Sequence, residues 1–185
     1  TEASDGHTKH FLLGAPDFLT TDTALLQKAD QYSRQGLRVL LLGSCPQLYR
    51  TPSEIREFHP MGFLVLSDCI KDDAMDTIRF FARQGVAVKV ISGDSPATVS
   101  YISKQAGIEG AEHYVDATTL PEDASELKEL VSRYTVFGRV TPEKKQAIIK
   151  AYQANGSVVG MVGDGINDVL ALKDADCGIA MASGA

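Results

Sequence analysis

From residue 61 onward, short apolar runs alternate with segments in which apolar residues recur at helical spacing. The apolar runs cover 62–66, 86–91, 135–137 and the stretch that ends at Val162. Segments of helical spacing follow over 72–84, 96–106 and 142–155, and another begins after Gly165. Strands that alternate with helices of this length are typical of a parallel sheet covered by helices on both faces. The predicted fold class is therefore α/β with a doubly wound parallel sheet.

Glycine, proline and hydroxyl residues mark the expected helix ends. Gly85 and Gly107 follow two of the helical segments, where glycine commonly ends a helix. Thr141 and Pro142 suit the N-cap and the first residue of the third helix. Between residues 110 and 132 the pattern is weaker and predicts only a helix over 121–132.

The first 60 residues have a different pattern. A strand is predicted over 9–13, a helix over 23–35 and a second strand over 37–42, followed by a polar stretch, 44–60, that contains three prolines. This segment is too short for a complete domain of its own. We expect it to be part of a larger α+β domain.

Composition narrows the possible function classes. The chain has 185 residues, 44% of them hydrophobic and 23% charged, with a formal net charge of -6. An acidic chain without a basic patch argues against a nucleic-acid partner. No apolar stretch reaches the ~18 residues of a membrane span, and no signal peptide is evident. We expect a soluble chain whose three cysteines are reduced.

Three apolar runs lead into aspartates, namely Asp68, Asp94 and Asp164. If the strands are parallel, at least the last two acids open at the same edge of the sheet, where α/β proteins bind anionic ligands. A single aspartate after a strand often only caps the next helix. Three such acids favour a functional site.

Two segments have the chemistry of a phosphate and metal site. Residues 163–168 read Gly-Asp-Gly-Ile-Asn-Asp, and two acids with an amide so close together suit Mg²⁺, which shares its ligands with phosphate oxygens. Residues 92–94 read Ser-Gly-Asp at a strand-to-helix turn, where a hydroxyl and backbone N–H groups can hold phosphate. No P-loop motif occurs.

One lysine is predicted to point inward. Lys145 projects toward the apolar face that Ile148 and Ile149 define on its helix, whereas Lys144 lies toward the edge. A buried ammonium needs a counter-charge, which a carboxylate–phosphate site would supply; a lysine that reaches out to water is the alternative. Arg139 could likewise pair with Asp94 or a ligand, or lie on the surface.

Together these segments resemble the P-type cation-transporting ATPases, whose phosphorylation domain belongs to the haloacid dehalogenase superfamily. The similar segments, in family order, are 14–16, 37–40, 68–71, 92–94, 139–145 and 163–181. The last of these resembles the family's hinge signature. The resemblance implies a haloacid dehalogenase-like sheet preceded by an incomplete nucleotide-binding segment, with the boundary between 1–67 and 68–185.

The resemblance also implies catalytic roles. Asp164 would ligate Mg²⁺, Asp168 would support the metal site and Asn167 would contact phosphate. Ser92 and Lys145 would hold the transferred phosphoryl group. The reaction would be phosphoryl transfer from ATP to a carboxylate, followed by hydrolysis of the acyl phosphate.

Besides Mg²⁺, the resemblance implies ATP as a second cofactor. A separate set of residues would bind it. Gly93, Asp94 and Arg139 would approach the nucleotide, and Arg38 would contact it from the other domain. Asp68 would lie at the hinge between the domains. The partners would be the remaining domains of the same pump: the actuator domain, the membrane helices and the rest of the nucleotide-binding domain. The chain would lie at the cytoplasmic face of a multi-pass membrane protein.

The chain departs from the family at several positions. The nucleophile motif Asp-Lys-Thr-Gly-Thr does not occur, so this chain is expected to be inactive by itself. Leu13, Lys71 and Ser92 stand where the family usually has lysine, arginine and threonine. Two alternatives are a soluble haloacid dehalogenase-type phosphatase, which also needs an early Asp-x-Asp strand, and a non-catalytic nucleotide-binding module.

Overall fold

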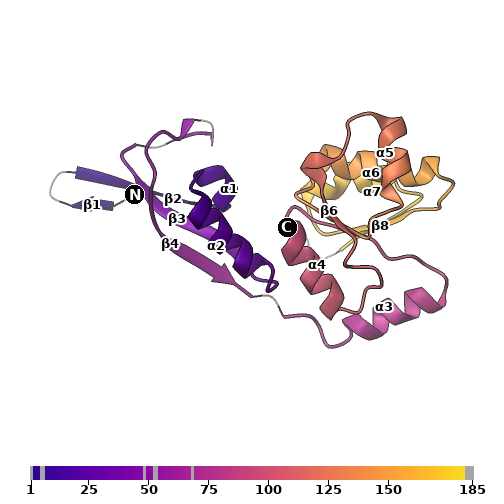
Figure 1. Cartoon of the computed structure of the whole chain (residues 1–185). Helices are drawn as coiled ribbons and strands as arrows, with labels where there is room; N and C mark the ends of the chain where they lie inside the picture. Colours follow the sequence, from indigo (N-terminus) through magenta and orange to yellow (C-terminus); the bar gives the residue numbers. More distant parts are fainter. Residues whose placement is uncertain (1, 5–6, 48, 52–53, 68, 182–185) are drawn as a thin grey trace. The chain divides into compact units, whose positions relative to one another are not determined.

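The computed structural model describes residues 2–4, 7–47, 49–51, 54–67 and 69–181 (Figure 1). The chain divides into two compact units, Thr1–Cys69 and Ile70–Ala185. The sequence placed this boundary after Ser67. Asp68, the expected hinge residue, lies outside the described residues. No helix within the described ranges is both long and apolar enough to cross a membrane.

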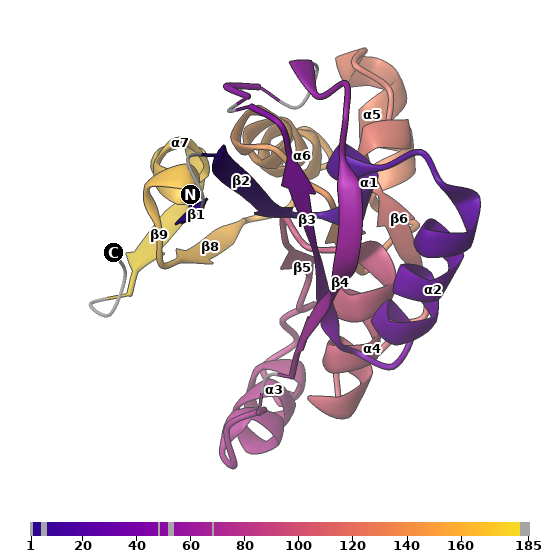
Figure 2. The ribbon, with the colours of Figure 1, turned by 90° about the vertical axis from the view of Figure 1, so that its left-hand side faces the viewer.

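The first unit is a four-stranded antiparallel sheet with two helices. Its elements are β1 (Glu2–Ser4), β2 (His7–Gly14), α1 (Pro16–Leu19), α2 (Thr23–Ser33), β3 (Arg38–Cys45) and β4 (His59–Leu66), and the strand order is β1-β2-β3-β4. Both helices lie on the same side of the strands (Figure 2). Alternate residues of β3 are buried, among them Val39 and Leu41, which is the pattern of a strand covered on one face.

The predicted strands over 9–13 and 37–42 and the helix over 23–35 are confirmed as β2, β3 and α2. The helix begins where the side chain of Asp22 accepts hydrogen bonds from the backbone N–H groups of Ala24 and Leu25. Such an N-cap explains why a polar residue marks this start in the sequence.

The assignment of residues 62–66 to the parallel sheet was wrong. They belong to β4, which pairs antiparallel with β3 from Arg38 opposite Leu66 to Ser44 opposite His59. An apolar run predicts a strand but contains no information about its partner, which a pairing distant in sequence decides. β4 is therefore a strand of the antiparallel sheet of the first unit, not of either parallel ladder.

The second unit is α/β, as predicted. It contains, in chain order, α3 (Ala74–Arg83), β5 (Val90–Ile91), α4 (Pro96–Gln105), β6 (Tyr114–Asp116), the 3₁₀ turn η2 (Ala117–Thr119), α5 (Ala124–Val131), β7 (Val136–Gly138), α6 (Pro142–Ala154), β8 (Gly160–Gly163), the 3₁₀ turn η3 (Ile166–Asp168), α7 (Val169–Asp174) and β9 (Cys177–Ala180). β6 was not predicted, and α5 begins later than expected because Asp123 caps it.

The parallel strands form two ladders rather than one continuous sheet. One is β5-β7-β6 and the other is β8-β9, and all their pairings are parallel. Within the described residues no ladder joins β5 to β8. The α/β class with parallel strands is thus confirmed, and these strands lie in two ladders.

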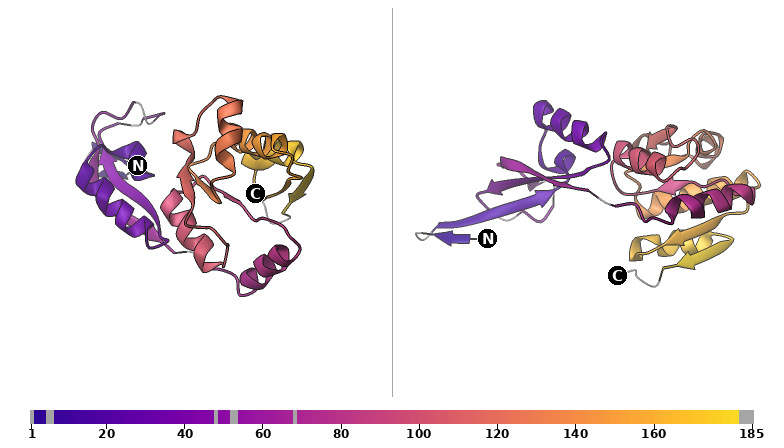
Figure 3. Two further views of the ribbon diagram at one scale, coloured as in Figure 1. Left: turned by 45° about the vertical axis from the view of Figure 1, so that its right-hand side comes forward. Right: turned by 90° about the horizontal axis from the view of Figure 1, so that it is seen from below.

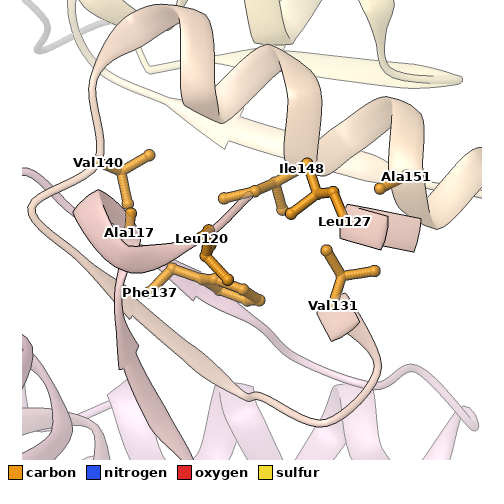
Figure 4. Packing of buried hydrophobic residues seen from close by; sticks show 8 residues of the cluster. All are labelled: Ala117, Leu120, Leu127, Val131, Phe137, Val140, Ile148 and Ala151. Carbon is orange, nitrogen blue, oxygen red and sulfur yellow. The ribbon is translucent and has the colours of Figure 1, made fainter. Parts of the chain in front are cut away.

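The main hydrophobic core holds α6 against β7 and α5. Its buried residues are Ala117, Leu120, Leu127, Val131, Phe137, Val140, Ile148 and Ala151 (Figure 4). A second cluster of Ile149, Met161 and Ala171 connects α6 to β8 and α7. The C-terminal elements lie beside α6 in both views of Figure 3. α6 therefore contributes to both clusters.

Candidate functional site

The C-terminal ends of β5 and β8 meet at an open pocket of about 410 Å³. It is lined by Ile91, Ser92, Gly93, Lys145, Met161, Val162, Gly163, Asp164, Asp168 and Met181. Five of the residues singled out in the sequence are among them: Ser92, Gly93, Lys145, Asp164 and Asp168. Two strand ends from different ladders and the first turns of α6 thus share one cavity.

An ion pair lies in the wall of this pocket. The Nζ of Lys145 donates to Oδ1 of Asp168 at 2.5 Å, and the side chains are 13% and 8% exposed. The other oxygen, Oδ2, accepts from the backbone N–H of Asp164 at 3.3 Å. The counter-charge expected for an inward lysine is therefore Asp168.

The charge state of Asp168 follows from these contacts. Burial alone would raise the pKa of this carboxyl. The hydrogen bond and the positive charge of Lys145, with two backbone N–H groups, outweigh burial and hold the pKa of Asp168 below its ordinary value. The carboxyl of Asp168 is thus ionised at neutral pH.

Gly163 is required by the close approach of Asp168. A Cβ at position 163 would lie 2.6 Å from Cβ of Asp168, closer than real carbon atoms approach. The backbone N–H of Asp168 also donates to the carbonyl of Gly165 at 3.0 Å, which closes the turn after β8. The glycine and the turn together bring Asp168 back under the end of the strand.

Lys144 has a different environment from the one predicted. It was placed toward the helix edge, but the residue is only 9% exposed. Its Nζ donates to the carbonyls of Leu120 and Pro121 at 3.3 and 3.1 Å and to Glu122 at 2.8 Å. Helical periodicity could not reveal this, because the segment that covers the first turn of α6 comes from a loop more than twenty residues upstream.

The turn after β5 is tied to the turn after β7. The backbone N–H of Arg139 donates to the carbonyl of Asp94 at 2.8 Å, and that of Val140 donates to the carbonyl of Ser92 at 3.0 Å. The hydroxyl of Ser92 accepts from the N–H of Asp94 at 3.1 Å. These bonds fix the position of Ser92 at the pocket.

The guanidinium of Arg139 pairs with Asp116, which the sequence did not single out. The distance between Nη1 and Oδ2 is 2.6 Å. Asp116 ends β6, and the two apolar residues before it, Tyr114 and Val115, are too short a run to indicate a strand. Asp116 lies at the end of a strand, as the predicted site acids do, but β6 is too short to be recognised from the sequence.

The remaining predicted residues lie elsewhere. Asn167 is exposed in η3 and does not line the pocket. Arg38 begins β3 in the first unit. Asp68, as noted, lies outside the described residues.

The donor set of the pocket suits Mg²⁺ in part. Among the described residues no three histidine, cysteine or acidic side chains are grouped to hold a metal ion. Asp164 is exposed and lines the pocket, whereas both oxygens of Asp168 already accept hydrogen bonds. Mg²⁺ is commonly bound by one or two carboxylates together with waters and phosphate oxygens. Asp164 could provide one such carboxylate.

The parallel strands of the second unit and the helices between them define an α/β protein. Residues 1–176 match the model of the haloacid dehalogenase-like hydrolases, and the chain belongs to that family.

The chain is also similar to cation-transporting ATPases. It is 43% identical over 182 residues to the calcium-transporting ATPase CtpE of Mycolicibacterium smegmatis, covering 98% of this chain and 23% of that protein. It is 35% identical to the probable cation-transporting ATPase exp7 of Streptococcus pneumoniae, covering 93% of this chain and 22% of the relative. For the magnesium-transporting ATPase, P-type 1, of Salmonella typhimurium, the identity is 37% and the coverage 87% and 18%. The chain thus spans less than a quarter of each relative.

Proposed function

We propose that the chain is part of an ATP-driven, cation-transporting P-type pump that forms an aspartyl phosphate. The observation that carries this proposal is the single pocket shared by Ser92, Lys145 and Asp164, with Asp168 fixing the lysine. The similarity to cation-transporting ATPases over nearly the whole chain supports it. These relatives are named for calcium and for magnesium, so the proposal is for a cation pump.

In the proposed reaction, an aspartate carboxylate attacks the γ-phosphorus of ATP and ADP leaves with the electrons of the broken P–O bond. Water then hydrolyses the acyl phosphate to phosphate and the free carboxylate. The ammonium of Lys145 and the hydroxyl of Ser92 would bind the transferred oxygens, and Asn167 would contact phosphate from the η3 turn. A bound Mg²⁺ would neutralise charge on the phosphate. Asp164 would hold it, and Asp168 would support the site through its bonds to Lys145 and Asp164.

The acceptor aspartate is proposed to come from outside this sequence. The sequence contains no Asp-Lys-Thr-Gly-Thr segment. β5 and β8 end at the same pocket, yet no ladder joins them within the described part of the chain. A further parallel strand that ended at this edge would present its last side chain to the pocket.

The nucleotide is proposed to contact residues of both units. Gly93, Asp94 and Arg139 belong to the two bonded turns beside the pocket and would approach ATP there. Arg38 would contact ATP from the first unit, the C-terminal part of a nucleotide-binding domain, and Asp68 would act at the hinge. The second unit would be the C-terminal part of the phosphorylation domain, at the cytoplasmic face of a multi-pass membrane protein.

The test is ion-stimulated ATP hydrolysis in the complete pump that contains this chain. We expect Asp164→Asn and Lys145→Ala each to abolish turnover. Asp123→Asn is the matched control, because Asp123 caps α5 away from the pocket and Asn is also a good cap. Full activity of either pocket variant would refute the proposed roles, and loss of activity in the control would show that the assay reports folding.

A further inference from the structure

Arg139 has an unusual backbone conformation. Its φ is +52°, and it is the only non-glycine residue with a positive φ among the described residues. This left-handed region is sparsely populated by residues with a side chain, because Cβ approaches the backbone closely. Such strain persists only where surrounding contacts hold it.

The contacts that hold Arg139 act on both its backbone and its side chain. The two backbone bonds to the 92–94 turn hold the main chain. The carboxylate of Asp116 holds the guanidinium through its Oδ2. The partner oxygen, Oδ1, accepts from both the N–H and the hydroxyl of Thr118, at 3.0 and 2.7 Å. Asp116 is therefore held in one orientation. Its bond to Arg139 in turn restricts the orientation of the guanidinium.

The β6–β7 register makes this arrangement specific. Asp116 lies directly opposite Gly138, the residue before Arg139. A Cβ on Gly138 would lie 2.5 Å from the backbone of Pro96, so the strand passes tightly against the start of α4. Gly138 at the end of β7, the strained Arg139 and Asp116 are therefore held close together beside the pocket.

From this geometry we infer that Asp116 is a positioning residue that orients the Arg139 guanidinium to bind the polyphosphate of a nucleoside triphosphate. The inference rests on the proposed function, which brings ATP to this turn. The side chain of Arg139 is 41% exposed, so ligand can reach it. A guanidinium carries five N–H donors in a planar fork, so one bond to Asp116 is compatible with a bond to phosphate.

A purely electrostatic reading predicts the opposite effect. If Asp116 only neutralised Arg139, its removal would leave a more positive site and ATP would bind more tightly. If Asp116 orients the arginine, its removal loosens the guanidinium, which must then be ordered on binding, and ATP binds less tightly. The sign of the change therefore separates the two.

The experiment measures the dissociation constant of ATP for the complete pump that contains this chain by isothermal titration calorimetry. Asp116→Asn keeps an oxygen that can accept from Thr118 but removes the charge that holds Arg139. Asp123→Asn is the control, since it removes the same charge from another capping aspartate of the same unit. The ¹⁵Nε–¹Hε signal of Arg139 in each variant reports the order of the guanidinium directly.

We expect Asp116→Asn to weaken ATP binding about three- to tenfold, in the range of one lost charge-assisted hydrogen bond. Asp123→Asn should have no such effect, Asp116→Glu should recover part of the loss, and Asp116→Asn should have no further effect in an Arg139→Gln chain. Unchanged or tighter ATP binding by Asp116→Asn overturns the positioning role and leaves the proposed function standing. ATP binding by the complete pump that Arg139→Gln leaves unchanged contradicts the nucleotide contact itself, and the positioning role is rejected with it.

Discussion

Lys145 and Asp168 form an ion pair of 2.5 Å that spans α6 and the turn after β8. Because Asp168 also accepts from the backbone N–H of Asp164, the pair ties the lysine to the strand end that carries the exposed carboxylate. The Asp168 side chain thus bonds to Lys145 through one oxygen and to the backbone of Asp164 through the other. These two bonds set how far the Lys145 ammonium lies from the backbone of Asp164. Changes at this pair should affect stability and the site together.

Lys145→Met should destabilise the second unit by about 1–3 kcal/mol, because it leaves the buried carboxylate of Asp168 without its charged partner. Urea unfolding followed by circular dichroism measures this. Lys150→Met is the control on the same helix: Lys150 pairs with Asp174 but is 59% exposed, so its loss should cost no more than about 0.5 kcal/mol. Equal effects of the two variants would contradict a special role of the buried pair.

The Lys145–Asp168 ion pair should also make the free energy of unfolding depend on pH in the acidic range. The folded-state pKa of Asp168 lies below its ordinary value of 3.8, so the stability that it contributes is present above that pH and is lost as the pH falls through the folded pKa. The difference in unfolding free energy between the wild type and Lys145→Met should therefore shrink as the pH falls below 3.8. Contributions from other aspartates are common to both chains and cancel. A difference that stays constant down to the lowest pH at which the chain folds would contradict the assignment.

Gly163→Ala should be destabilising by about 1–3 kcal/mol, because the new methyl group overlaps the side chain of Asp168 and forces it away from Lys145. Gly165→Ala is the matched control two residues further on. At Gly165 the nearest atom to an added Cβ is 3.9 Å away, and its φ of −135° suits any residue. Thermal unfolding of both variants measures the contrast. Similar melting temperatures for the two would show that the turn yields to the added methyl group.

Lys144→Met should cost about 1–2 kcal/mol, since it leaves the carbonyls of Leu120 and Pro121 without their donor. Glu122→Gln should have almost no effect, because the Glu122 side chain is 92% exposed and the ion pair is screened by water. Chemical unfolding of both variants distinguishes the carbonyl bonds from the ion pair. A larger loss for Glu122→Gln than for Lys144→Met would reverse this assignment.

The sequence alone determined the local elements of the second unit. Pro96 and Pro142 at helix starts, and the glycines after the helices, are signals within a few residues of the ends that they mark, so α4 and α6 were predicted within a few residues. The Ser-Gly-Asp and Gly-Asp-Gly turns were likewise recognised at strand ends, because apolar runs and turn residues are adjacent in the chain. The inward direction of Lys145 followed from helical spacing in the same way.

Tertiary structure decided which elements pair and which charges meet. The antiparallel pairing of β4 with β3, the separation of β5 from β8 and the burial of Lys144 each depend on residues distant in sequence. The partners Asp168 for Lys145 and Asp116 for Arg139 lie 23 residues away in each case. Spacing in a sequence describes one helix or strand at a time, whereas an ion pair between two elements exists only after the core has set them side by side.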